Sequence, residues 1–65
     1  MWHQKLTVGD SIKLRDKKSK DIFFGQVTDY TNDTVTIREY RSTRFLTFRL
    51  SVYTVYNLRG KRLSD

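Results

Sequence analysis

Apolar and polar residues alternate along several short segments of the chain, and no segment has the period of a helix. Ser11–Arg15 is the clearest example, because Ile12 and Leu14 alternate with polar or charged residues. Successive side chains of a strand point to opposite faces, so this segment predicts a strand with one buried face. The whole pattern predicts an all-β protein, a small five-stranded, strongly bent antiparallel barrel.

Four more strands are expected, and polar runs separate them. The expected strands are Ile22–Tyr30, Thr34–Tyr40, Phe45–Leu50 and Thr54–Leu58. The run Asp16–Asp21 contains no apolar residue and predicts a solvated hairpin loop. Residues 31–33, Thr-Asn-Asp, predict a second hairpin turn, because Asn and Asp tolerate turn conformations and bond their own main chain. Arg41–Arg44 is expected to form the third connection.

The phase of the last strand requires a local irregularity. A continuous alternation after Leu50 would expose Val55, so Ser51–Tyr53 is expected to form a short turn of helix that lets both Val52 and Val55 turn inward. Within the second strand, Gly25 indicates a place where the sheet bends or another backbone approaches closely.

The length of 65 residues allows one domain with a small core. We expect the core to span residues 6–58, with residues 1–5 and 59–65 mobile. The chain contains no cysteine, which excludes disulfides and thiolate zinc sites and favours a cytoplasmic location. No apolar run approaches the roughly 18 residues that a membrane helix needs, so no membrane association is expected.

Positive charge dominates the composition: 13 Lys and Arg against seven Asp and Glu give a net charge of +6. Such a balance favours association with polyanions. The first hairpin concentrates five of these cations, which are candidates for phosphate contacts: Lys13, Arg15, Lys17, Lys18 and Lys20. The alternative is a polar hairpin tip that only resists edge aggregation.

Outward positions of the later strands form a possible binding platform of hydroxyls, amides and arginines. Its members are Gln26, Thr28, Thr34, Thr36, Arg38, Thr47 and Arg49, with Tyr53 near its end. Arg38, Arg49 and Tyr53 are the nucleic-acid candidates among them, because arginines bond phosphates and a tyrosine ring can stack on a base. The alternative is an ordinary solvent face.

The aromatic residues suggest a second kind of contact. Ile22, Phe23 and Phe24 place large apolar groups on both faces of one strand, so not all of them can enter a single small core. A protein partner, a second copy of the chain or Trp2 could cover the remainder. The protein-interface candidates are Trp2, Phe24, Tyr40 and Tyr56.

Residues for catalysis are scarce. The chain has one histidine, His3, and its three glycines are too scattered to form a phosphate-binding loop. No metal-ligand spacing is present. We therefore expect a protein that is not an enzyme and uses neither a cofactor nor a metal.

The segment Ser11–Val55 resembles the Sm-like small barrels, a branch of the SH3-like fold that includes the bacterial Sm-type RNA chaperone and a ribosome-maturation domain. The matching residues are Ile12, Leu14, the FFGQVTDY stretch from Phe23 to Tyr30, the DTVTI stretch from Asp33 to Ile37, and Val52 with Val55. The resemblance implies a five-stranded barrel that binds RNA and often assembles into rings through its edge strands. The VGD-x-I-x-L pattern followed by G-x-V also resembles the KOW and Tudor-like barrels, which bind nucleic acid or proteins.

These observations together predict a non-enzymatic nucleic-acid-binding module, with RNA favoured over DNA as the ligand. The alternative is a protein-interaction module or a small regulator of a larger machine, such as one encoded by a mobile element. A purely structural subunit that forms homo-oligomers through its edge strands is a third reading.

Overall fold

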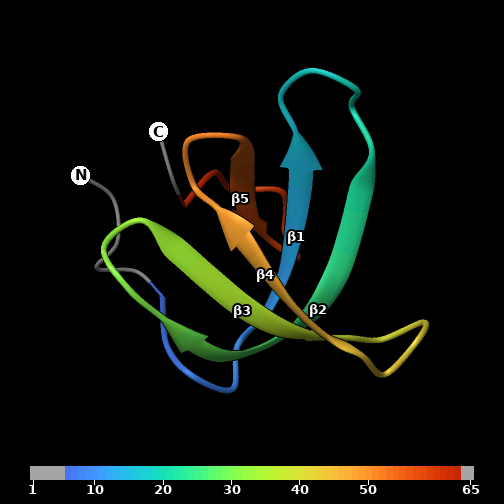
Figure 1. Cartoon of the computed structure of the whole chain (residues 1–65), viewed down its shortest axis with the longest axis vertical. Helices are drawn as coiled ribbons and strands as arrows, with labels where there is room; N and C mark the ends of the chain where they lie inside the picture. Colours follow the sequence, from blue (N-terminus) through green and yellow to red (C-terminus); the bar gives the residue numbers. More distant parts are fainter. Residues whose placement is uncertain (1–5, 64–65) are drawn as a thin grey trace.

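The computed structural model describes residues 6–63, which form one antiparallel sheet without a helix (Figure 1). The strands are β1 (Ser11–Asp16), β2 (Ile22–Tyr30), β3 (Thr34–Glu39), β4 (Phe45–Arg49) and β5 (Tyr53–Asn57). Their order across the sheet is β4-β3-β2-β1-β5, so β4 and β5 are its two edges and hydrogen bonds do not close it. The predicted all-β class and the five antiparallel strands are confirmed, and each predicted strand boundary lies within one residue of the observed one.

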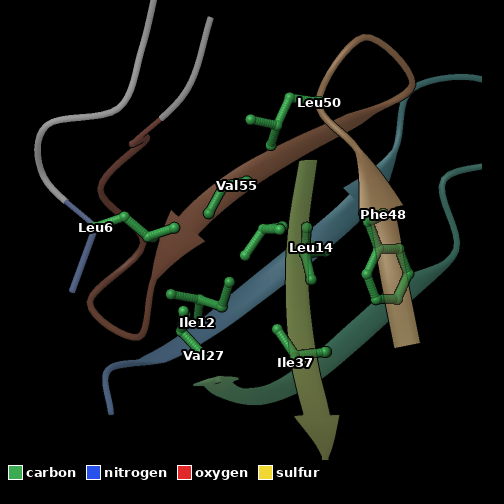
Figure 2. Packing of buried hydrophobic residues seen from close by; sticks show 9 residues of the cluster. Leu6, Ile12, Leu14, Val27, Ile37, Phe48, Leu50 and Val55 are labelled. Atoms are coloured by element: carbon green, nitrogen blue, oxygen red, sulfur yellow. The ribbon is translucent and has the colours of Figure 1, made fainter. Parts of the chain in front are cut away.

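The apolar residues that alternate along the strands meet in one core (Figure 2). The core consists of Leu6, Ile12, Leu14, Val27, Val35, Ile37, Phe48, Leu50 and Val55. Every strand contributes at least one of these side chains. Because the strands have period 2, the residues between them point to the outer face of the sheet.

At Gly25, β2 and β3 approach each other so closely that no side chain fits between them. A Cβ atom at this position would lie 2.7 Å from the carbonyl oxygen of Arg38 and 2.6 Å from Cδ1 of Ile37. The prediction of a close backbone approach at Gly25 is therefore confirmed. The pairing of β2 with β3 also shifts register between Val27 and Asp29, a bulge that increases the local bend of β2.

The connection between β4 and β5 differs from the sequence prediction. Val52 donates its N–H to the carbonyl of Arg49 at 3.0 Å, which closes a tight turn and not a helical segment. The prediction that Val52 turns inward is wrong, since its side chain is 41% exposed. The reason is the period of β5: Val55 faces the core, so the inward position before it belongs to Tyr53, two residues earlier.

Residues 59–63, which the sequence places outside the core, fold back along β5. Tyr56 forms a bridge with Arg62, and Leu63 donates its N–H to the carbonyl of Val55 at 2.7 Å. The Leu63 side chain packs against the core. This part of the chain therefore covers one side of β5.

Candidate functional site

Lys13 lies between two aromatic residues on the outer face of the sheet. It pairs with Phe24 of β2 on one side and with Tyr56 of β5 on the other. Residues that pair directly in an antiparallel sheet present their side chains on the same face. Phe24 is 45% exposed, while Lys13 and Tyr56 are half-buried.

Tyr40 extends this arrangement by one strand. Its N–H bonds the carbonyl of Phe24 at 3.1 Å. Its hydroxyl forms a hydrogen bond with the hydroxyl of Ser11, which is on the outer face of β1. We call Tyr40, Phe24, Lys13 and Tyr56 the aromatic row. The row crosses the sheet from the end of β3 to β5.

The ammonium of Lys13 is placed over the Tyr56 ring. The distance from Nζ to the ring centroid is 5.1 Å, within the range of a cation–π interaction. This contact holds the lysine stem against β5 while its charge stays at the surface.

Two further rows of outward residues flank the aromatic row. Arg15 pairs with Ile22 on β2 and with Thr54 on β5. On the other side, Arg38 pairs with Phe45 of β4 and with Gln26 of β2. Ile22 and Phe45 are 49% and 66% exposed. Each of these arginines therefore lies beside one exposed apolar side chain.

The lysine-rich loop that follows β1 is organised by Asp16. One carboxylate oxygen, Oδ1, accepts the backbone N–H groups of Lys18 at 2.7 Å and Ser19 at 2.9 Å. These bonds, with a smaller contribution from the nearby Lys18 charge, hold the pKa of the Asp16 carboxyl below its ordinary value of 3.8. The backbone carbonyl of Asp16 accepts from Lys20 N at 3.0 Å, which closes the loop.

This loop also contacts the turn between β4 and β5. Lys17 donates its N–H to the carbonyl of Val52 at 3.0 Å. An open hollow of about 600 Å³ lies where the two connections meet. It is lined by Asp16, Lys17, Lys18, Ser19, Ser51 and Val52. Two of the predicted phosphate-contacting lysines, Lys17 and Lys18, therefore border this hollow.

The predicted platform is only partly assembled. Thr34 pairs with Arg49, and Thr36 pairs with Thr47. The hydroxyls of Thr36 and Thr47 bond each other at 2.9 Å. Thr28 lies at the bulge of β2, where its hydroxyl donates to the carbonyl of Thr36. These hydroxyls bond protein atoms, which reduces their capacity to bind a ligand.

Tyr53 belongs to the inner side of the sheet and not to the platform. Its ring lies 4.8 Å from that of Phe48 and 6.1 Å from that of Phe23, both at edge-on angles. It is packed against the core, so the structure separates it from Arg38 and Arg49. Trp2, the remaining aromatic candidate, lies outside the described residues.

The sequence divided the candidates into a cationic set and an aromatic set, and the structure brings members of both together. Lys13, Arg15 and Arg38 share the outer face with Phe24, Tyr40 and Tyr56. Ile22 and Phe45 were not among the candidate site residues. For Ile22 the signal that could have linked it to the site is the register of the first hairpin, because its short loop pairs Arg15 with Ile22 as well as Lys13 with Phe24.

Within residues 6–63, no group of three or more His, Cys, Asp or Glu residues is placed to hold a metal ion. The same part of the chain has no helix long and apolar enough to cross a membrane. No family model matches the chain, and neither the curated proteins nor the solved structures contain a significant match.

Proposed function

We propose that this chain is a non-enzymatic nucleic-acid-binding module that uses the outer face of β1, β2 and β5 together with the lysine-rich loop. The observation that carries the proposal is the aromatic row, which places a lysine among three aromatic residues on adjacent strands. Aromatic rings can stack on bases, and cations beside them can neutralise phosphates. Arg15 and Arg38 supply more positive charge on the same face.

The loop extends the cationic surface beyond the end of β1. Lys13, Arg15 and Lys17 follow one another at alternate positions, roughly 6.8 Å apart where the strand is regular. Lys18 and Lys20 continue the charge around the loop, whose backbone Asp16 fixes. A polyanion that contacts these groups releases counterions, which gives affinity that falls with salt.

A titration of the full chain against labelled RNA and DNA oligonucleotides tests the proposal. We expect binding that weakens steeply between about 50 and 200 mM salt. RNA is the preferred ligand in this proposal. Absence of binding to every nucleic acid at low salt would contradict the proposal.

A double substitution distinguishes the effect of charge at the lysine-rich loop from the effect of the net charge of the protein. Lys17→Glu with Lys18→Glu should weaken nucleic-acid binding, because it reverses two charges at the loop. The matched control is Arg59→Glu with Lys61→Glu, which changes the net charge equally. The control pair follows β5. Because Asn57 at the end of β5 pairs with Ile12 near the start of β1, the control pair lies at the opposite end of β1 from the lysine-rich loop. Equal losses in both variants would remove the loop from the site.

Exposed apolar side chains favour one alternative, a protein-interaction module or small regulator of a larger machine. Ile22, Phe24, Tyr40 and Phe45 are all more than two-fifths exposed, and contiguous apolar surface is typical of protein interfaces. A partner captured on the immobilised protein, resistant to nuclease and lost on Phe24→Ala or Phe45→Ala, would support this alternative.

We infer that the fold is a small barrel of the SH3-like or Sm-like type. The strand order β4-β3-β2-β1-β5 and the close approach of β2 and β3 at Gly25 support this assignment. We propose the cytoplasm as its compartment, because the chain contains no cysteine and nothing in its sequence marks an oxidising compartment.

A further inference from the structure

We propose that Lys13 and Tyr56 form a subsite for one unpaired nucleotide, and that the contact between them opens when the nucleotide binds. The inference rests on the proposed nucleic-acid-binding function. It names the part of the ligand that each residue takes: the base lies on Tyr56, and the adjacent phosphate bonds the Lys13 ammonium.

In the free protein, the ammonium of Lys13 lies over one face of the Tyr56 ring. Its Nζ lies 5.1 Å from the ring centroid. A base can stack on that side of the ring only after the ammonium moves away. The long lysine stem allows this movement without a change of backbone, and the released charge then faces the ligand's phosphate.

The surroundings of Lys13 fit the same ligand. Phe24 pairs with Lys13 on the opposite side from Tyr56, so two aromatic residues flank one cation. Adjacent strands are about 4.8 Å apart, which places Phe24 and Tyr56 roughly two strand spacings from each other. Arg15, two residues further along β1, is positioned to contact the next phosphate toward the lysine-rich loop.

This arrangement selects unpaired nucleic acid. In a duplex the faces of the bases are covered by their stacked neighbours, and only base edges and phosphates are accessible in the grooves. Stacking on an aromatic ring tolerates any base, since every base has a π face. The subsite therefore accepts single strands of RNA or DNA and discriminates against duplexes.

The test compares three labelled probes by fluorescence anisotropy: a 12-nucleotide oligouridine, a 12-nucleotide oligothymidine and a 12-base-pair duplex. We expect the full chain to bind both single strands more tightly than the duplex. Tyr56→Leu should weaken single-strand binding by about fivefold to a hundredfold, the loss typical of one stacked base. Phe45→Leu is the matched control, because Phe45 is 66% exposed on edge strand β4 and lies outside the aromatic row.

A second measurement reports on the Lys13 contact itself. In the free protein, the ring current of Tyr56 should shift the Lys13 side-chain protons upfield in NMR spectra, and this shift should be absent in Tyr56→Leu. Addition of oligothymidine should remove it from the wild-type protein. Lys13→Gln should lower the slope of log affinity against log salt by about one, whereas Lys13→Arg should preserve it.

The outcomes separate this inference from the proposed function. Duplex binding as tight as single-strand binding, or normal single-strand binding by the Tyr56→Leu variant, would overturn the subsite while the proposed function stands. A Lys13 shift that persists in the complex would overturn the opening step. Failure of the wild-type protein to bind any probe at low salt would overturn both.

Discussion

At the scale of single residues, the absence of a side chain at Gly25 allows β2 to lie against Ile37 and Arg38 of β3. A Cβ atom there would meet the Arg38 carbonyl oxygen at 2.7 Å and the flexible end of Ile37 at 2.6 Å. We predict that Gly25→Ala lowers the free energy of unfolding by about 1–3 kcal/mol, the usual cost of overpacking. Urea denaturation measures this loss. Adding Ile37→Val removes the clashing methyl but not the carbonyl, so Gly25→Ala with Ile37→Val should stay less stable than Ile37→Val alone.

Asp16 gives the lysine-rich loop a dependence on pH. Its pKa is lowered because its ionised form accepts the Ser19 and Lys18 N–H groups. The carboxylate therefore stabilises the folded loop above the ordinary pKa of 3.8, and this contribution is lost as the pH falls through the lower folded pKa. We predict that the stability of Asp16→Asn declines less than that of the wild-type protein between about pH 4 and pH 2. Parallel declines in the two proteins would contradict this role.

At the scale of elements, the turn between β3 and β4 carries local strain. Glu39 and Arg44 are joined by a hydrogen bond across the turn, and Thr43 has a φ of 58°. A β-branched residue in this left-handed region is unfavourable. We predict that Thr43→Gly raises the free energy of unfolding by up to about 1 kcal/mol, because glycine adopts this conformation without strain. Ser42→Gly in the same turn should not stabilise the protein, and thermal denaturation compares the two variants.

β1 and β3 were the most predictable strands, because their residues alternate strictly. Ile12 and Leu14 fix the phase of β1, and Val35 with Ile37 fix that of β3. The turn before β5 was less predictable. The turn closed by the Val52 N–H and the Arg49 carbonyl shifts the phase, so that Tyr53 and not Val52 takes the inward position. Periodicity assigns side chains to faces, but it cannot say which strands are neighbours.

The same limit explains why the sequence did not predict that the residues of the candidate site lie close together. The sequence identified Lys13, Phe24, Tyr40 and Tyr56 individually and assigned them to different partners. Their proximity follows from the pairing of β1 with both β2 and β5, and the second of these pairs is far apart in the chain. Long-range pairing of this kind leaves no local signal in a single sequence.

At the scale of the whole molecule, the two edges of the sheet are unequal. Self-assembly through β4 of one copy and β5 of the next requires the outer side of β5 to be free. In this chain Tyr56 bridges Arg62, and Val55 accepts the N–H of Leu63, so residues 62–63 already occupy part of that side. The covered β5 edge opposes an assembly in which each copy adds its β4 to the β5 of its neighbour.

We therefore predict that the full chain is a monomer of 7.8 kDa in the absence of ligand, measured by size-exclusion chromatography with light scattering. Truncation after Gly60 removes the residues that cover β5 and exposes its backbone groups, so the shortened chain should associate at a lower concentration than the full chain. Substituting Leu63→Asp should have the same effect in a milder form, because it removes the core contact that holds this segment in place. A stable ring or dimer of the full chain, unchanged by either alteration, would show that assembly does not depend on the β5 edge. In that case the apolar residues of the outer face, Ile22, Phe24 and Phe45, become the surface through which copies of the chain associate.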